Sequence, residues 1–327
     1  MGLLTLALVI DLILGDPDWL WRRVPHPVVV IGKVIDWFDD FRSSSAFQTL
    51  AQRCRIESKE RATLLWGGVL TLCLLAGSLF IGWLIDVFGP LGLVVELLIV
   101  AILIAQKSLY DHVRRVHAAL KSQGLPAARQ AVSMIVGRDV SGLDESGVSK
   151  AAIESLAENF SDGVVAPAFW YAVGGVPGIL FFKAINTADS MIGHRNVKYE
   201  EFGKAAAKID DVMNLPAARL SSLLVVVAVA FAQGRKLASK VWEKTREDAP
   251  LHRSPNAGWP ETSFAVALGL TLGGPRRYGD ESVAGVSLNE DGRSTANRMD
   301  IENALALMLR SCFVLIAFVV LLWFLGL

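Results

Sequence analysis

Three carboxylates recur at intervals of four in the stretch ESLAENFSDG, as Glu154, Glu158 and Asp162. On a helix this spacing places them nearly above one another, where like charges repel by roughly a few tenths of a kcal/mol per pair. Gly163 predicts that the helix ends directly after Asp162, at the terminus whose dipole disfavours anions. The row therefore breaks several local rules of helix stability at once.

A bound ligand would explain this acidic row. A solvated helix face accounts for one or two of the acids, but not for all three. A divalent cation or a cationic substrate would convert the repulsion into coordination, because Mg²⁺ is typically held by one or two carboxylates plus phosphate oxygens. We predict Glu154, Glu158 and Asp162 as catalytic residues, with Glu158 and Asp162 also as metal ligands. Asn159 is the predicted binding residue beside them.

A second polar group lies in the stretch NTADSMIGHRNVKYEEFGKAAAKIDDVMNLPAARL. Asn186 and Asp189 are one helical turn apart, and so are Asp211 and Asn214, so each pair can face one ligand. Asn214 could equally cap a helix that starts at the following Leu-Pro. That alternative leaves Asp189, Asp210 and Asp211 unexplained. We predict Asp189 as catalytic, Asp210 and Asp211 as metal ligands, and both asparagines as binding residues.

The stretch GDPDWLWRRVPHPV follows the first apolar run. Asp16 ends that run together with a proline, and His26 lies between two prolines that fix an extended turn. The stretch is either an interfacial turn whose tryptophans lie at headgroup level or a binding site that contains Asp16 and His26.

A fourth polar stretch, HRSPNAGWPE followed by GLTLGGPRRYGD, contains His252, Asn256, Arg276 and Arg277. Its glycines allow close backbone approach, and two adjacent arginines suit an anionic group through fork-shaped hydrogen bonding. An arginine pair is more often solvated or bound to headgroups, but here it shares a Gly-rich loop. We predict these four residues as binding residues for substrate or nucleotide.

Several common catalytic motifs are absent from the sequence. It has no GxxxxGK[ST] loop, no GxGxxG after a strand, no HExxH and no GxSxG. The five histidines are scattered without metal-ligand spacing, and the three cysteines form no CxxC pair. A zinc enzyme, a serine hydrolase and a disulfide scaffold are therefore disfavoured.

The composition predicts a membrane protein. Hydrophobic residues make up 53% of the 327 residues, charged residues make up 20%, and mean hydropathy is +0.43. The formal net charge of zero gives no basic field for nucleic acid. Apolar segments that could span or enter a bilayer lie at about 2–14, 62–85, 87–105, 164–182, 215–232 and 304–327.

We predict an all-α, polytopic integral membrane protein, built as one membrane-embedded domain over 1–327. Its main polar loops are 15–61, 106–163, 183–214 and 233–303, and helical periodicity predicts helices within them. The Lys and Arg distribution places 15–61, 106–163 and 233–303 in the cytoplasm. The Pro- and Gly-rich run 164–182 suits a broken or re-entrant helix, and 215–232 is short for a crossing.

From these two segments we predict that neither crosses the membrane fully, or that 183–214 folds back into a cavity open to the cytoplasm. The N-terminal run lacks a basic n-region and a small-residue cleavage site, so we expect it to be retained.

Taken together, the motifs resemble the adenosylcobinamide-phosphate synthase family, the membrane proteins CbiB and CobD of cobalamin biosynthesis. The resemblance runs from about residue 10 to 280 in one order, through the motifs GDPDWLWRRVPHPV, GRDVSGLDESGVSKAAIESLAENFSDGVVAPAFW, NTADSMIGHRN, DDVMNLPAARL and HRSPNAGWPE. At position 194 the family pattern usually has Tyr, whereas this chain has His.

The resemblance implies ATP-dependent amide formation between a propionate carboxyl of adenosylcobyric acid and the amine of aminopropanol or its phosphate. It implies Mg²⁺ as cofactor, ATP as a substrate, and an active site that faces the cytoplasm from the cytoplasmic membrane. The implied partners are the corrinoid, the aminoalcohol and membrane lipid, with other late cobalamin-assembly enzymes left open.

On this resemblance the acids named above are candidates for holding Mg²⁺ and the ammonium of the aminoalcohol. The cationic candidates for nucleotide phosphate or corrinoid side chains are Arg195, Arg219, Arg276 and Arg277. The residue that accepts the amine proton cannot be read from spacing, although His26 and His252 are candidates.

Two other classes of function remain open at this stage. A membrane prenyl- or alcohol-phosphate transferase also holds Mg²⁺-diphosphate between Asp and Asn side chains, but its two sites would require an internal repeat, and none is found. A non-catalytic membrane sensor or transporter would show no ATP turnover and no dependence on the acids in the loops.

Overall fold

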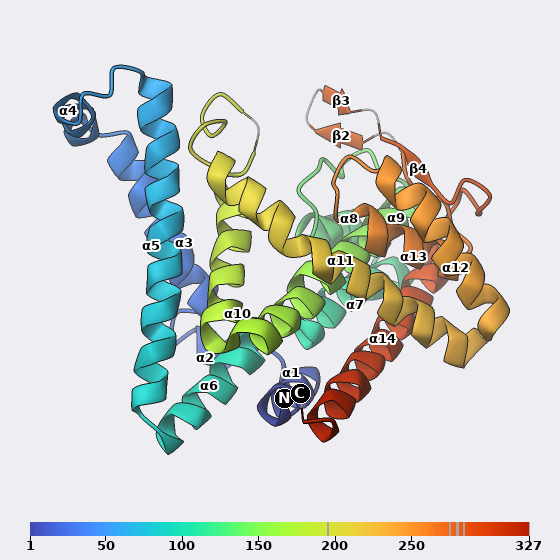
Figure 1. Cartoon of the computed structure of the whole chain (residues 1–327). Coiled ribbons are helices and arrows are strands. Elements are labelled where there is room, and N and C mark those ends of the chain that lie inside the picture. Colours follow the sequence, from blue (N-terminus) through green and yellow to red (C-terminus); the bar gives the residue numbers. More distant parts are fainter. Residues whose placement is uncertain (195, 275, 279–280, 284, 327) are drawn as a thin grey trace. The chain divides into compact units, whose positions relative to one another are not determined.

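The computed structural model describes residues 1–194, 196–274, 276–278, 281–283 and 285–326, with the backbone alone for residue 18 and for 276–278 and 281–283. The described chain is 77% helical, with almost no strand (Figure 1). Five helical runs within it are long and apolar enough to cross a bilayer, which confirms the predicted all-α polytopic membrane fold. These runs are Lys59–Val87, Pro90–Ser122, Glu145–Ile192, Lys204–Gln233 and Arg298–Phe324.

The chain forms two compact units, each assembled from segments that are distant in the sequence. The first unit comprises Met1–Gly15, Ala105–Ala166 and Asn214–Leu327. The second comprises Asp16–Ile104 and Pro167–Met213. The polar groups predicted from the sequence are therefore divided between the two units.

The second unit contains one membrane hairpin, the helices that precede it and parts of two later helices. Its elements are α2 (Asp18–Trp21), α3 (Pro27–Arg42), α4 (Ser45–Arg53), α5 (Lys59–Val87), α6 (Pro90–Leu103), most of α10 (Ala166–Ile192) and the start of α11 (Lys204–Gln233). Helices α5 and α6 form the predicted hairpin, because Gly89 adopts φ +53° and Pro90 starts α6. The predicted apolar segments 62–85 and 87–105 fall largely within these two helices.

Helix α10 is broken, as its Pro and Gly content indicates. Gly175 has φ +58° and ψ −150° inside the helix, a conformation that glycine adopts without steric cost. Gly178 packs so closely that an added Cβ would lie 2.2 Å from the Trp170 carbonyl oxygen. The predicted segment 164–182 thus falls in two helical pieces that meet at Gly175.

Helix α11 begins earlier than the sequence analysis allowed. It starts at Lys204, because the run KAAAKIDDVMN consists largely of residues that tolerate a helix well, and it continues through Pro216. Asn214 lies inside this helix, so the alternative that it is an N-cap is wrong. The 30-residue helix is long enough to cross a bilayer, unlike the isolated segment 215–232.

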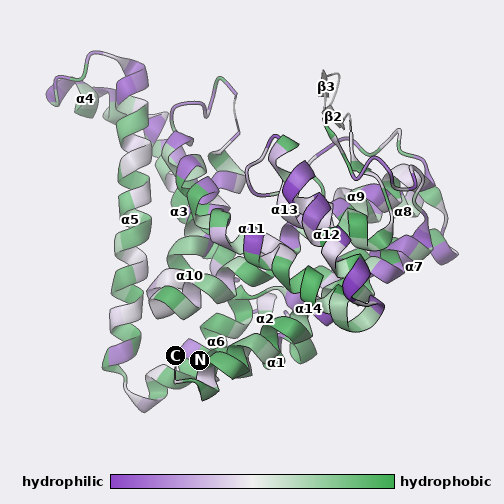
Figure 2. Ribbon diagram, turned by 45° about the vertical axis from the view of Figure 1, so that its right-hand side comes forward, coloured by the Kyte–Doolittle hydropathy of each residue, from purple (hydrophilic) through white to green (hydrophobic). Residues whose placement is uncertain are grey.

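The first unit is a bundle built around three helices. Helices α7 (Gln106–Ser122), α9 (Glu145–Phe160) and α14 (Arg298–Phe324) pack on one another, and α1 (Gly2–Leu14) packs on α7 and α14. This unit also contains α11 from Asn214 onward, α8 (Leu125–Ser133), α12 (Arg235–Asp248), α13 (Gly258–Leu268), the π-helical turn η1 (Ser161–Val165), the 3₁₀ turn η2 (Ala249–Leu251) and four short strands. Figure 2 shows hydrophobic residues along α1 and hydrophilic residues gathered on α12.

Two small antiparallel ladders, which the sequence analysis did not predict, lie between α13 and α14. Strand β1 (Leu272–Gly273) pairs with β4 (Ser287–Leu288), and β2 (Arg276–Tyr278) pairs with β3 (Glu281–Val283). Strands of two or three residues are too short to show the alternation that identifies a strand in a sequence. The first ladder brings Gly273 to the Glu154 side chain of α9.

Candidate functional site

The acidic row runs into a π-helical turn and not into a helix end. Helix α9 passes through η1 directly into α10, so the prediction that Gly163 terminates the helix is wrong. Pro167 explains the local geometry: it has no N–H to offer the Gly163 carbonyl four residues earlier. That carbonyl accepts the N–H of Ala105 instead, at 3.0 Å. Asp162 therefore lies within a continuous helical run, and π turns of this kind are frequent at functional sites.

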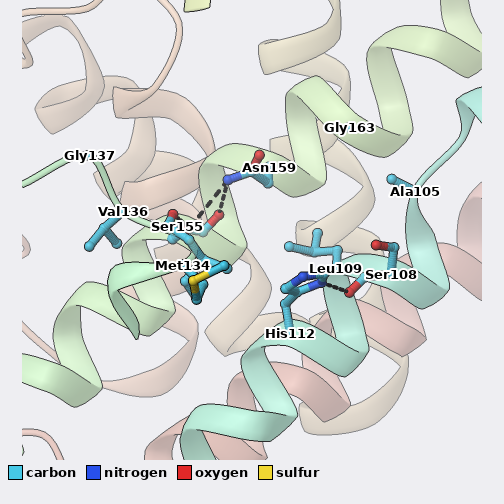
Figure 3. Close-up of a pocket in the computed structure, with 11 residues that line it drawn as sticks. Ala105, Ser108, Leu109, His112, Met134, Val136, Gly137, Ser155, Asn159 and Gly163 are labelled. Atoms are coloured by element: carbon cyan, nitrogen blue, oxygen red, sulfur yellow. Dashed lines mark hydrogen bonds between the residues drawn. The ribbon is translucent and has the colours of Figure 1, made fainter. Parts of the chain in front are cut away.

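A cavity of about 410 Å³ lies beside this π turn in the first unit. Its size is within the range usual for small-molecule sites. It is lined by Ala105, Ser108, Leu109, His112, Met134, Ile135, Val136, Gly137, Ser155, Asn159 and Gly163 (Figure 3).

The polar side chains of the cavity wall are held in place by hydrogen bonds. Ser155 donates to the Ile135 carbonyl at 2.7 Å, and Asn159 Nδ2 donates to the Ser155 carbonyl at 2.9 Å. With its amide nitrogen held in this way, Asn159 presents its Oδ1 as an acceptor away from those bonds (Figure 3). His112 lies on α7, across the cavity from α9. Its Nδ1 is 2.7 Å from the carbonyl oxygen of Ser108 on the same helix.

A second, smaller cavity of about 110 Å³ shares a wall with the first. The shared residues are Ile135, Val136, Gly137 and Ser155. The smaller cavity adds charged side chains, because Arg138, Glu154 and Glu158 line it. Glu158 is exposed, as its place in the predicted site requires.

Glu154 is buried and joins two loops to α9. Its Oε2 accepts from Arg138 Nη2 at 2.9 Å, and its Oε1 accepts from the Gly273 N–H at 2.8 Å. Gly273 must be glycine, since it has φ +76° and an added Cβ would lie 2.4 Å from the Val286 carbonyl oxygen. The Gly-rich loop and the GRDV loop thus meet on one carboxylate.

The sequence analysis missed Arg138. Helical spacing identifies only partners on the same helix, whereas Arg138 reaches Glu154 from the preceding loop. The signal that could have found it is the Gly-Arg-Asp sequence at the start of the longest motif. A glycine next to an arginine predicts a loop that brings a cation close to a ligand.

The other predicted residues of the first unit lie on α11 and in the loop 252–257 between η2 and α13. Arg219 stacks over the Trp259 ring at 4.8 Å and donates to the Leu215 carbonyl at 2.9 Å. His252 Nε2 lies 3.9 Å from Glu261 Oε1. Asn214 and Asn256 are both buried, at 1% and 6% exposure.

In the second unit, the predicted acids of α10 and α11 come together as pairs. Asn186 Nδ2 donates to Asp210 Oδ1 at 3.2 Å, and Asp189 interacts electrostatically with Asp211 and with His194. Asn186 and Asp189, predicted to face one ligand from α10, belong in the structure to a polar group that also includes Asp210 and Asp211 of α11.

Asp16 and His26 also lie near each other, with Asp16 Oδ1 3.8 Å from His26 Nε2. His26 caps α3, because its Nδ1 accepts the Val28 N–H at 3.2 Å, and Trp21 packs edge-on against its ring at 4.5 Å. These contacts are compatible with both interpretations, and the binding role of Asp16 and His26 stays a prediction. Arg195 and the side chains of Arg276 and Arg277 lie outside the described residues.

The predicted metal site depends on which side chains can supply ligand atoms together. Within the described part of the chain, no group of three or more His, Cys, Asp or Glu side chains is arranged to hold a metal ion. Glu158 and Asp162, on successive turns beside the cavities, suit Mg²⁺ only if phosphate oxygens complete its shell, as is usual for this ion. Asp210 and Asp211 remain predicted ligands on the same terms.

Comparison with known proteins decides the family. The chain matches the family described as CobD/Cbib protein over residues 4–308. The chain belongs to this CobD/Cbib family. The resemblance predicted from the sequence motifs is thereby confirmed.

Several CobD/Cbib relatives carry the name "Cobalamin biosynthesis protein CobD". One from Sinorhizobium sp is 50% identical over 97% of this chain and 96% of its own length. One from Brucella suis is 51% identical over 93% of this chain and 91% of its own. One from Rhodobacter capsulatus is 44% identical over 85% of this chain and 83% of its own length. No solved structure matches the chain.

Proposed function

We propose that this protein acts in cobalamin biosynthesis as an ATP-dependent amide ligase. It joins the amine of aminopropanol, or of its phosphate, to a propionate carboxyl of adenosylcobyric acid. Relatives named for cobalamin biosynthesis, half identical over nearly the whole chain, support the pathway. The observation that supports the chemistry is the pair of adjoining cavities: the larger has an uncharged wall that includes His112, Ser155 and Asn159, and the smaller is lined by Arg138, Glu154 and Glu158 among others.

A carboxylate does not react with an amine until one of its oxygens becomes a leaving group. In the proposed reaction a carboxylate oxygen attacks the γ-phosphorus of ATP, the bond to ADP breaks, and an acyl phosphate forms. The amine then attacks the acyl carbon, the bond to phosphate breaks, and the amine loses one proton. Charge develops on phosphate oxygens in both steps, where preorganised cations lower the barrier.

The residues of the first unit divide these tasks. Glu158 and Asp162 would hold Mg²⁺ together with phosphate oxygens, and the ion would neutralise charge on the transferred phosphoryl group. Arg138, fixed by Glu154, places a cation on the wall of the smaller cavity. Arg219 and the arginines of the Gly-rich loop are proposed contacts for nucleotide phosphate or corrinoid side chains.

The location follows from the same proposal. Because ATP is a cytoplasmic substrate, we place the protein in the cytoplasmic membrane with its site open to the cytoplasm. The corrinoid and the aminoalcohol are its small-molecule partners, and lipid surrounds its apolar helices. Enzymes that act later in cobalamin assembly would receive its product.

The test is reconstitution with purified protein in detergent or nanodiscs. The protein is incubated with adenosylcobyric acid, Mg-ATP, and either aminopropanol or its phosphate, and the amide is sought by mass spectrometry. We expect product with one or both amines, together with one ADP per amide. Omission of ATP or Mg²⁺ should abolish it. Absence of product in every combination, from protein that unfolds cooperatively on heating, would refute the ligase proposal.

A further inference from the structure

The proposed reaction must remove a proton from the attacking amine, and histidine is the side chain best matched to that task near neutral pH. A neutral imidazole is a base only at the ring nitrogen that carries a lone pair. The hydrogen bond made by one nitrogen therefore decides whether the other can accept a proton. The hydrogen bonds of each histidine therefore indicate which of its ring nitrogens can accept a proton.

The two histidines predicted as bases are poorly placed for the role. His26 Nδ1 accepts the Val28 N–H, so the remaining nitrogen, Nε2, carries the proton in the neutral ring. His252 Nδ1 lies 3.1 Å from the Ser254 N–H and 3.3 Å from the Ser254 carbonyl oxygen, and its Nε2 lies 3.9 Å from Glu261 Oε1. Neither ring lines one of the two cavities, and the Nε2 of each is near a carboxylate, Asp16 or Glu261.

Two others face carboxylates. His117 Nε2 lies 3.7 Å from Glu302 Oε2, and His194 interacts with Asp189. Neither lines one of the two cavities described above. Their contacts are those of ion pairs.

His112 has the opposite arrangement. Its Nδ1 lies 2.7 Å from the Ser108 carbonyl oxygen, which can only accept, so Nδ1 carries the proton and Nε2 holds the lone pair. Its side chain lines the 410 Å³ cavity from α7, opposite Ser155 and Asn159 on α9 (Figure 3). The backbone bond also fixes the ring, as a positioned base requires.

The rest of this cavity suits an amine. None of the other described residues on its wall carries a charged side chain, whereas Arg138, Glu154 and Glu158 line the adjoining cavity. The Asn159 Oδ1 is a neutral acceptor for an N–H. A cavity with two acceptors and no cation favours a group that donates hydrogen bonds.

We propose, resting on the ligase function proposed above, that His112 is the general base for amide formation and that the 410 Å³ cavity receives the amine. His112 Nε2 takes one proton from the bound ammonium, the freed amine attacks the acyl carbon, and the second proton lost by the nitrogen leaves with the departing phosphate. Phosphate leaves with the electron pair of the broken C–O bond. The imidazolium then returns its proton to water.

The test uses His112→Asn, because the asparagine amide can still donate to the Ser108 carbonyl but cannot accept a proton near neutral pH. We expect kcat for the amide to fall by about 10²–10⁴-fold at neutral pH, with the KM for the amine nearly unchanged. The loss should shrink as pH rises toward the pKa of the free amine, because the substrate then arrives deprotonated. His117→Asn, five residues along the same helix, is the matched control and should behave as wild type.

Hydroxylamine separates this inference from the ligase proposal. It is a neutral nucleophile at pH 7 and traps an acyl phosphate without a protein base, so His112→Asn should form the hydroxamate at the wild-type rate. Wild-type protein that makes neither amide nor hydroxamate would refute the ligase proposal itself. If wild type is active, then an H112N variant with wild-type kcat, or one that loses amide and hydroxamate equally, overturns the role of His112.

Discussion

Among single residues, the acids of the opening row have different surroundings. Glu154 is 5% exposed and holds Arg138 and the Gly273 N–H, whereas Glu158 is exposed at the cavity wall. The repulsion inferred from their spacing is therefore relieved at Glu154 by a cation that the sequence analysis did not identify. Glu154 joins two loops to α9, and Glu158 lines the smaller cavity.

This difference predicts that the same substitution affects stability at Glu154 and activity at Glu158. Glu154→Gln should lower the free energy of unfolding by about 1–3 kcal/mol, because it leaves the partly buried Arg138 guanidinium without its charged partner. Glu158→Gln should change stability by less than about 0.5 kcal/mol, as surface changes usually do, yet abolish amide formation. Thermal unfolding in detergent and the amide assay measure the two effects. Unchanged activity in E158Q would mean that this acid is only a solvated surface group.

A second residue-scale prediction concerns Asp39 in the second unit. Its Oδ2 accepts from Lys198 Nζ at 2.9 Å and from the Tyr199 hydroxyl at 3.2 Å, and its Oδ1 pairs with Arg42. Burial raises the pKa of the Asp39 carboxyl, but the bonds from Arg42 and Lys198 outweigh burial and hold it below its usual value. The ionised form is therefore favoured in the folded protein.

Because the folded pKa is depressed, Asp39 stabilises the protein above its unfolded pKa of about 3.9, and this stabilisation is lost as pH falls through the folded value. Asp39→Asn should lower stability by about 1–3 kcal/mol at pH 7, and the difference from wild type should vanish in acid. Unfolding temperatures between pH 7 and about pH 3 test this. Asp40→Asn, at the exposed neighbouring position, is the control. An equal deficit at every pH would contradict the ionic explanation.

Among the helices, the break in α10 gives a matched pair of adjacent glycines. Gly175 adopts φ +58° and ψ −150°, which costs a side chain of order 1–3 kcal/mol, whereas Gly174 has no atom within 4 Å of an added Cβ. Gly175→Ala should therefore lower the unfolding temperature, and Gly174→Ala should leave it unchanged or raise it slightly. Thermal unfolding of both variants in one detergent makes the comparison. Equal stability would mean that α10 can be straight at Gly175.

Local sequence pattern predicted the helices well. It failed for elements that are very short and for elements that depend on residues distant in the chain. Hydropathy and helical spacing placed the apolar segments and the helices of 106–163, since both depend on near neighbours in the chain. The π turn escaped because it depends on Pro167 four residues beyond Gly163, and on Ala105 from another segment. The strands β1 to β4 escaped because two or three residues show no period.

The same limit applies to the site. The sequence identified the acids and asparagines through their types and spacing, but it could not show that Arg138 reaches Glu154 from the preceding loop. Nor could it rank the histidines, since the tautomer of His112 depends on one backbone contact. Residue type indicates which chemistry is available, and only the fold decides which partners it meets.

For the whole molecule, the remaining question is the side of the membrane on which 183–214 lies. Helices α10 and α11 are long enough to cross, but α10 is broken at Gly175. We predict that this segment is reached from the cytoplasm, either because neither helix crosses fully or because it lines a cavity open to that side. A single cysteine at the exposed Ser190 position tests this.

The labelling experiment replaces Cys54, Cys73 and Cys312 and adds Ser190→Cys. A membrane-impermeant thiol reagent applied to oriented vesicles should label it from the cytoplasmic face. A variant that keeps only the exposed Cys54 is the cytoplasmic reference, and a single Phe88→Cys in the turn between α5 and α6 is the reference for the other face. Labelling of the Ser190 position from the Phe88 face alone would refute the prediction.

The discontinuous make-up of the two units also sets an order of assembly during translation. The second unit has all of its segments once the ribosome has passed Met213, and domains fold as they emerge. The first unit does not, because α1, α7 and α9 all pack on α14, the last helix to be made. The first helix synthesised, α1, therefore lacks its packing partner α14 until synthesis of the chain is nearly complete. A chain that stops before Arg298 would carry a complete second unit and an unfinished first one, with the apolar faces of three helices left for the quality-control machinery to recognise.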